Sequence, residues 1–174
     1  IFLALAEQGV VKAQYQLGLM YGKGKGVTKN YSKAIKWWNL AADQGNIKAQ
    51  YNLGWIYEMG KGVSINNKKA VNWYRLASIK GHLKAQERLD IIINKAAEAQ
   101  INFALGVQFE SGQGVPQDFR EAIKRYRLAA NLGHIKAQEK INLVLSEQLL
   151  QGVKSDKTRT IKTTNQTNKK KKSL

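Results

Sequence analysis

The glycine-rich stretch GKGKG at residues 22–26 is the part of the sequence that most resembles a phosphate cradle. A P-loop requires a preceding strand, a Lys followed by Ser or Thr, and a helix whose backbone amides face the phosphate. Here the stretch instead returns in phase, as GKG at 60–62 and GQG at 112–114, where Gln113 takes the position of the Lys. Loops that recur in phase within helical hairpins predict chain reversals, so we expect no nucleotide site.

The other residues that could do chemistry are few and dispersed. His82 and His134 each follow a glycine at equivalent positions of different repeats, which favours a role in turns over a pair of ligands. Acidic residues are scattered, with no His beside them at ligand spacing, and the absence of Cys excludes disulfides and thiolate metal sites. The sequence therefore predicts no catalytic site, no metal and no cofactor, and a protein that is not an enzyme.

The strongest pattern is an internal repeat. The heptapeptide KAQYQLG at 12–18 returns as KAQYNLG at 48–54, an offset of 36 residues that holds over everything between them. A unit of this length cannot bury its apolar face alone, so neighbouring copies must stack into a solenoid. Proteins of this architecture mostly bind other molecules.

The spacing of apolar residues predicts two amphipathic helices in each repeat. Apolar positions four, five and eight residues apart predict the packing face of the first helix, and a Gly recurs on that face as Gly18, Gly54 and Gly106. Because a helical Gly costs about 1 kcal/mol relative to Ala, its return indicates close approach of a neighbouring helix. The expected packing sets are Ala13, Leu17, Gly18 and Tyr21, then Ala49, Leu53, Gly54 and Tyr57, then Ile101, Leu105, Gly106 and Phe109.

The second helix of each repeat has its own signals. Asn30, Asn66 and Asp118 follow the glycine loops and are expected as N-caps, and Asp118 with Glu121 is similar to a capping box. The apolar stripe that follows has the spacing i, i+3, i+4, i+7. Its members are Ala34, Trp37, Trp38 and Ala41, then Ala70, Trp73, Tyr74 and Ala77, then Ala122, Arg125, Tyr126 and Ala129.

The strings AQYNLGWIYEMGKGV and KKAVNWYRLA together resemble the Sel-1-like repeat, a helix-turn-helix relative of the tetratricopeptide repeat. The resemblance covers about residues 1–145. It implies an all-α fold, an α/α superhelix (solenoid) of helix-turn-helix repeats that serves as a scaffold or adaptor in multiprotein assemblies. The third copy departs from the pattern, with Arg125 where Trp37 and Trp73 stand in the others.

We expect one solenoid domain over 1–151 and a disordered basic tail over 152–174, which is rich in Lys, Thr, Asn and Ser. Residues 1–9 line up with 37–45, so the chain is expected to begin inside a partial first repeat. Full repeats are expected at about 11–45, 47–81 and 100–133. Between the last two the offset is 52 rather than 36, and an unbroken apolar line predicts one long helix over about 83–110. A capping helix is expected at about 135–151.

The net charge of +17 leaves several partners open. It is consistent with a lysine-rich solvated surface, or with an acidic partner that could be a protein, a nucleic acid or an anionic lipid surface. No apolar run is long enough to predict a transmembrane segment. The Lys run at 169–172 is consistent with a nuclear localisation signal, with a contact to a lipid surface, or with a terminal segment that only increases solubility.

The leading hypothesis is a protein-protein interaction scaffold that binds a peptide or partner protein on the concave face lined by the first helices. The alternative is electrostatic docking to nucleic acid or an anionic membrane. Groove positions should differ between copies, and Trp55 is the preferred contact, with burial against the next helix as its alternative. The candidate partner-binding residues are Gln16, Leu19, Lys23, Asn52, Trp55, Met59, Val107 and Gln108.

Overall fold

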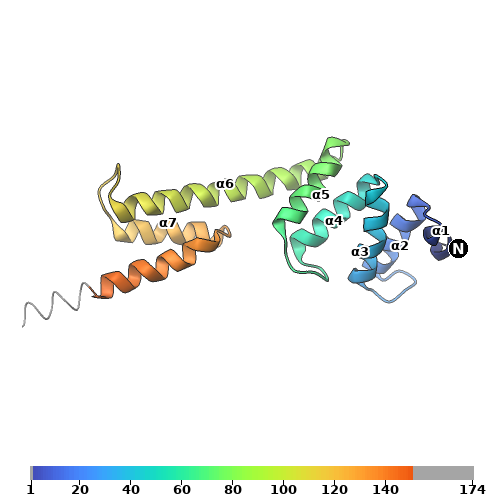
Figure 1. The fold of residues 1–174 in the computed structure, drawn as a ribbon, viewed down its shortest axis with the longest axis horizontal. Coiled ribbons are helices and arrows are strands. Elements are labelled where there is room, and N and C mark those ends of the chain that lie inside the picture. Colours follow the sequence, from blue (N-terminus) through green and yellow to red (C-terminus); the bar gives the residue numbers. More distant parts are fainter. Residues whose placement is uncertain (1, 151–174) are drawn as a thin grey trace, which may run out of the picture. The chain divides into compact units, whose positions relative to one another are not determined.

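The structure, a computed structural model, describes residues 2–150, and every regular element in that range is a helix (Figure 1). Residues 135–150 form a further helix, called helix 135–150 below. The residues of the predicted disordered tail, including its lysine run, lie outside the described residues. The labelled elements are α1 (Phe2–Glu7), α2 (Val11–Lys23), α3 (Tyr31–Asp43), α4 (Ile47–Met59), α5 (Asn67–Ile79), α6 (Leu83–Ser111) and α7 (Phe119–Asn131).

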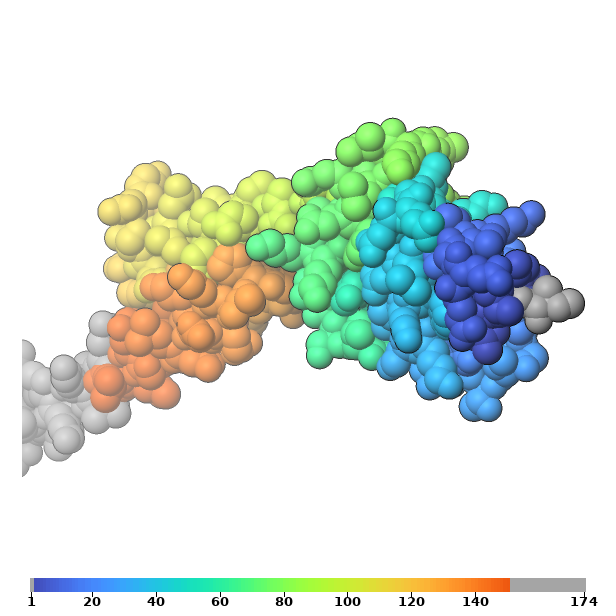
Figure 2. Space-filling model, turned by 45° about the vertical axis from the view of Figure 1, so that its right-hand side comes forward, coloured from blue at the N-terminus to red at the C-terminus, as the bar shows by residue number. Residues whose placement is uncertain are grey.

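The chain folds as two compact units, residues 1–94 (unit 1) and 95–174 (unit 2), of which 95–150 are described. Helix α6 runs through the boundary, and its residues 93–98 are all exposed. The repeat suggested a single solenoid domain. The structure divides the chain instead after Asn94, within the extra residues that separate the second and third copies of the repeat. Within unit 1, the hairpins α2–α3 and α4–α5 pack in series, and Figure 2 shows their side chains in continuous contact on the face in view.

The helix boundaries follow the expected local signals. The side chains of Asn30, Asn66 and Asp118 accept backbone N–H groups at the starts of α3, α5 and α7, which confirms these N-caps. Gly24 and Gly60 close α2 and α4 with φ of 71° and 65°, in the left-handed region that favours glycine. These caps fix where each hairpin turns.

The repeated helical glycines lie against aromatic rings. A Cβ placed on Gly54 would come within 2.6 Å of the Tyr74 ring, and one on Gly106 within 2.5 Å of the Tyr126 ring. Gly18 stands in the same relation to Trp38. The packing role predicted for these glycines is confirmed, and the partner is the aromatic residue of the second helix in the same hairpin.

Helix α6 has a different role in each unit. Its first part covers unit 1, where Ala85 and Leu89 are buried in one cluster with Tyr74. Its second part is the first helix of the hairpin in unit 2. Helix 135–150 covers that hairpin in turn, because its Ile141 and Val144 share a buried cluster with Tyr126. One continuous helix thus ends one stack and begins the next.

The third hairpin departs from expectation at Ile101 and replaces a Trp by Arg125. Ile101, predicted to be buried like Ala49, is 59% exposed. Ala49 packs against Ala41 and Ala42 of the preceding second helix, whereas no second helix precedes residues 95–111 within the same unit. Arg125 is half-buried and its Nε donates to Glu121. The stem of Arg125 therefore stays partly covered while its charge is paired near the surface.

Candidate protein-interaction surface

The predicted partner-binding residues fall on three helices. Gln16, Leu19 and Lys23 lie on α2 and Asn52, Trp55 and Met59 on α4, all in unit 1, whereas Val107 and Gln108 lie on α6 in unit 2. The candidates therefore form two groups, one in each unit. Four members, Gln16, Leu19, Asn52 and Trp55, are half-buried; the other four are exposed.

Trp55 occupies the junction of two cores in unit 1. It packs partly buried against the cluster of α3 and α4 that contains Leu53, and also against the cluster of α5 and α6 that contains Tyr74. Leu19 packs against the first of these clusters. Trp55 consequently has both a structural role and a solvent-facing part. Burial against the next helix and contact with a partner are therefore compatible for this residue.

Two adjacent first helices also meet through polar side chains. Burial raises the pKa of Tyr15 on α2, and the nearby amide side chain of Asn52 on α4 opposes this shift. Tyr15 packs against the same buried cluster as Trp55. The candidate positions of α2 and α4 therefore belong to one packed surface.

A carboxylate network that the sequence reading missed joins three helices of unit 1. The Tyr74 hydroxyl of α5 donates to Glu58 Oε2 on α4 at 2.7 Å, and Arg88 of α6 donates from Nε to the same oxygen at 3.1 Å. Arg88 Nη2 also pairs with Glu58 Oε1. Burial, with the hydrogen bond to Glu58, holds the pKa of Tyr74 far above its ordinary value. The pKa of Arg88 is raised chiefly by its hydrogen bond to Glu58.

The same network recurs in unit 2, shifted by 52 residues. Tyr126 donates to Glu110, and Lys140 Nζ lies 2.8 Å from Glu110 Oε1. Burial and the hydrogen bond to Glu110 raise the pKa of Tyr126 in the same way. Each carboxylate ties a hairpin to the helix that covers it. The networks are structural ties, because every carboxylate oxygen already has a partner.

The first hairpin lacks this network for a steric reason. The equivalents of Glu58 and Tyr74 are Gly22 and Trp38, and a Cβ on Gly22 would lie 2.9 Å from the Trp38 ring. The larger ring therefore excludes the carboxylate side chain. A search for polar positions that recur at an offset of 52 could have found the other two networks, since Glu58, Tyr74 and Arg88 all have counterparts there.

The two histidines lie in turns, as predicted, and each stacks on an aromatic ring of the preceding first helix. The centroid of the His82 ring is 4.5 Å from that of Tyr51, and that of His134 is 4.0 Å from that of Phe103. His82 Nδ1 also accepts the Ala85 N–H at 3.2 Å and so begins α6. Both histidines therefore pack the turn that follows a hairpin against the first helix of that hairpin.

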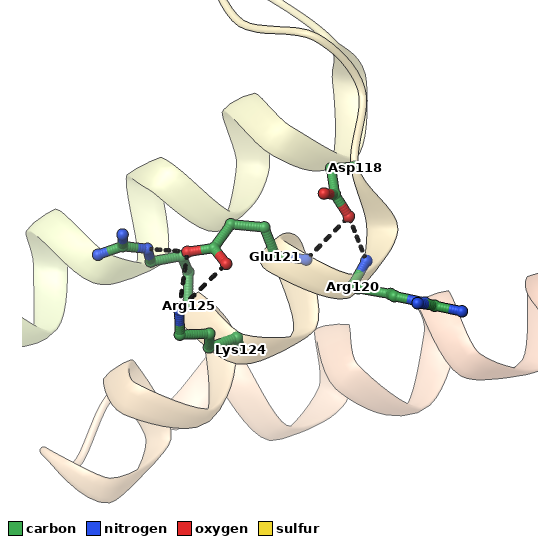
Figure 3. A network of polar contacts seen from close by, with 5 residues as sticks. All are labelled: Asp118, Arg120, Glu121, Lys124 and Arg125. Atoms are coloured by element: carbon green, nitrogen blue, oxygen red, sulfur yellow. Dashed lines mark hydrogen bonds and ion pairs between the residues drawn. The ribbon is translucent and has the colours of Figure 1, made fainter.

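The start of α7 carries an ion-pair network, shown in Figure 3. Asp118 accepts the backbone N–H of Arg120 and Glu121. The Glu121 carboxylate does not return to Asp118, as a full capping box would require; it pairs with Lys124 and with Arg125. These partners, Lys124 first, lower the pKa of Glu121. The predicted capping box is therefore half formed.

The described residues contain neither a candidate metal site nor a candidate membrane span. Among residues 2–150, no group of three or more His, Cys, Asp or Glu side chains is placed to hold a metal ion. In the same range no helix is both long and apolar enough to cross a membrane.

These features define a helical-repeat protein built from helix-turn-helix hairpins. The sequence profile of the Sel1 repeat matches residues 11–46, 47–82 and 95–134, more than half of the chain. The chain belongs to the Sel1 repeat family, as its sequence led us to expect. Proteins of this family bind other proteins and are generally interaction scaffolds. No curated protein matches the chain.

Solved structures of repeat proteins are similar to the chain. One is a protective antigen of uropathogenic Escherichia coli strains that displays an SLR fold, with 31% identity over 84% of this chain and a TM-score of 0.48. This chain spans only 28% of the length of that antigen. A Sel1 repeat protein from Oxalobacter formigenes has 31% identity, with 81% of this chain and 94% of that chain covered and a TM-score of 0.45. Helicobacter pylori cysteine rich protein B has 22% identity, coverage of 79% and 92%, and a TM-score of 0.38.

Proposed function

We propose that the chain is an interaction scaffold that binds a peptide or a partner protein on the first helices α2 and α4 of unit 1. The observation that carries the proposal is a contrast between equivalent positions. Leu17 and Leu53 are equivalent buried positions that hold the same residue, whereas several of the more accessible positions of α2 and α4 differ between the copies. The differing pairs are Gln16 and Asn52, Leu19 and Trp55, and Lys23 and Met59.

Such a contrast is what selective binding requires. Positions that hold the repeats together are constrained to one size, while positions facing a partner are free to differ from copy to copy. Trp55 has the properties of a binding hot spot, because it is a large aromatic side chain that is held by packing and still partly accessible. Val107 of unit 2 is the equivalent of Trp55, and Gln108 is the equivalent of the buried Ile56; both are exposed in unit 2 and are proposed as further contacts.

The test is capture of a partner from the native source with the full chain as bait, followed by titration of the captured protein. Trp55→Ala should weaken binding by about 2 kcal/mol or more, as hot-spot aromatics do. Leu76→Ala is the matched control, since Leu76 is an exposed apolar residue on the second helix α5.

Because Trp55 also packs against two cores, a second variant separates binding from folding. Met59→Lys changes an exposed side chain, 38% accessible, at the end of α4. It should weaken binding while the melting temperature stays unchanged. Full affinity in both variants would exclude this surface as the binding site.

A further inference from the structure

The positive charge of the chain is unevenly distributed between its parts. Residues 1–94 carry 14 Lys or Arg and five Asp or Glu, a net charge of +9. Residues 95–150 carry seven basic and six acidic residues, a net charge of +1. Within the described part of the chain, nearly all of the excess charge therefore belongs to unit 1.

Unit 1 has two edges at which its helices turn. The longer loops inside the hairpins, 24–30 and 60–66, lie on one side, and the short turns at 44–46 and 80–82 lie on the other (Figure 1). The two longer loops are neighbours, because a Cβ on Gly62 would come within 2.6 Å of Tyr31 Cβ at the start of α3. They form one continuous edge across both hairpins.

This loop edge carries lysines and no acidic residues. The sequence contains no Asp or Glu between Glu7 and Asp43, or between Glu58 and Glu87, and Glu58 itself is paired with Arg88. The opposite edge, by contrast, mixes Lys12, Lys48, Lys80 and Lys84 with acidic residues. We call the following exposed side chains the lysine edge: Lys25, Lys29, Lys33, Lys61, Lys68 and Lys69.

Aromatic rings hold part of the lysine edge in place. The ammonium of Lys33 lies 5.2 Å from the centroid of the Tyr21 ring, and that of Lys69 lies 5.1 Å from the Tyr57 ring. Lys29 covers Tyr31 at 4.9 Å. Such contacts restrict the long side chains before any partner arrives, which reduces the entropy lost on binding.

The third hairpin has lost this edge. Gln113 replaces Lys61 and Glu121 replaces Lys69. The Glu121 carboxylate is paired with Lys124 and Arg125, so the equivalent surface carries both signs of charge. The lysine edge is therefore a property of the hairpins α2–α3 and α4–α5, and the repeat fold by itself does not require it.

We propose that the lysine edge binds an acidic segment of a partner protein. The proposal rests on the proposed function, because it assigns the chemistry of part of the same partner. Single-stranded nucleic acids are bound largely by stacking bases on aromatic faces, and here lysines cover the rings of Tyr21, Tyr31 and Tyr57. The lysine edge also contains no Arg, the side chain that reads guanine in a bidentate manner.

A membrane surface fits this edge less well. Interfacial elements insert several large apolar side chains between lipid headgroups. The exposed large apolar side chain of the two loops is Ile65, which is 68% accessible. Carboxylates of an acidic peptide can instead approach the ammonium groups one by one, with no need for insertion.

The test uses the full chain and a fluorescein-labelled oligoglutamate at physiological salt. The edge variant is Lys25→Glu with Lys61→Glu, two equivalent loop positions, and the matched control is Lys12→Glu with Lys48→Glu on the opposite edge. Both variants change the net charge equally. The edge variant should bind about tenfold more weakly, and the control less than about threefold more weakly.

Equal losses in the two variants would overturn the proposal, because the probe would then respond to net charge alone. Tighter edge-dependent binding of duplex DNA or of phosphatidylserine vesicles than of oligoglutamate would overturn the choice of a protein partner. If the edge variant melts early, Lys25→Gln with Lys61→Gln should still weaken binding, and unchanged affinity would refute the proposal. Trp55→Ala separates the two proposals. It should weaken binding of the captured partner and leave oligoglutamate binding intact, whether or not the lysine edge binds oligoglutamate.

Discussion

At the scale of residues, each hairpin is held by one aromatic ring lying on one glycine. The pairs are Gly18 with Trp38, Gly54 with Tyr74 and Gly106 with Tyr126. The identity of the ring then decides what else fits: the two tyrosines donate to a carboxylate, while the tryptophan requires a second glycine, Gly22. A single contact thus determines the local polar structure around it.

Gly54→Ala is expected to destabilise the chain although Ala is favoured over Gly in helix interiors by about 1 kcal/mol. The added Cβ would lie 2.6 Å from atoms of the Tyr74 ring. The backbone or the ring must move, and such overpacking typically costs about 1 to 3 kcal/mol. Urea unfolding measures the loss. In a Tyr74→Leu background the same substitution should cost less, and an undiminished cost would contradict this contact.

The raised pKa of Tyr74 gives the chain a dependence on alkaline pH. The folded state retains the phenolic proton above pH 10, the ordinary tyrosine pKa, at which the unfolded chain releases it. The stabilisation is complete below about pH 10 and is lost as the pH rises further, by up to about 1.4 kcal/mol per pH unit. In Tyr74→Phe the decline between about pH 10 and 11 should be shallower. Identical slopes in urea unfolding would refute the pKa shift.

At the scale of elements, α6 explains why one array becomes two units. In the first hairpins a buried glutamine ties each first helix to the preceding second helix: Gln14 donates to Ala6 O and Gln50 to Ala42 O, both at 3.2 Å. The equivalent Asn102 donates instead to Glu98 O of its own helix. Since no second helix precedes this part of α6 within unit 2, the tie between hairpins has no acceptor there.

The covering helices should stabilise their own units separately. Leu89→Ala removes a buried side chain of α6 from unit 1, and Ile141→Ala removes one of helix 135–150 from unit 2. Each should cost about 2 to 5 kcal/mol in its own unit. Hydrogen exchange should accelerate in α4 and α5 for the first variant and in α7 for the second. Ile91→Ala, at a 53% exposed position of α6, is the control. Equal acceleration in both units would contradict two cooperative units.

At the scale of the whole molecule, charge and packing are separable properties. The chain carries +17, but the excess lies in unit 1 and in the residues after 150, while 95–150 are nearly neutral. The buried clusters of both units are built from Ala, aromatic and aliphatic residues. Electrostatics can therefore be altered at the surface with little effect on folding.

Deletion of residues 154–174 removes eight Lys or Arg and one Asp. If the scaffold proposal is right, affinity for the captured partner should remain nearly intact, and oligoglutamate binding should remain sensitive to Lys25→Glu with Lys61→Glu. If charge alone drove binding, affinity would fall by orders of magnitude and depend steeply on salt. Titration at low and physiological salt distinguishes these results. Loss of binding on deletion, with Trp55→Ala silent, would support electrostatic docking to nucleic acid or a membrane.

The sequence by itself determined the local features of this protein. Helical periodicity, Asn and Asp caps, and phased glycines are encoded within a few residues of where they act, so the hairpins and the family could be read from the pattern. The packing role of Gly54 could also be predicted from the sequence. Gly destabilises a helix interior, so its recurrence at the same position of each repeat indicates a compensating contact there.

Only the tertiary structure decided which distant residues meet. Tyr74 rather than Trp73 lies on Gly54, Glu58 joins Tyr74 to Arg88 across 30 residues of chain, and the lysines of two loops fall on one edge. The exposure of Ile101 likewise depends on whether another helix precedes it in space. The periodicity of apolar residues specifies which face of a helix is buried, but the stacking of the hairpins decides which helix packs on that face. The interruption between the second and third repeats changes the neighbouring helix without changing the local apolar pattern.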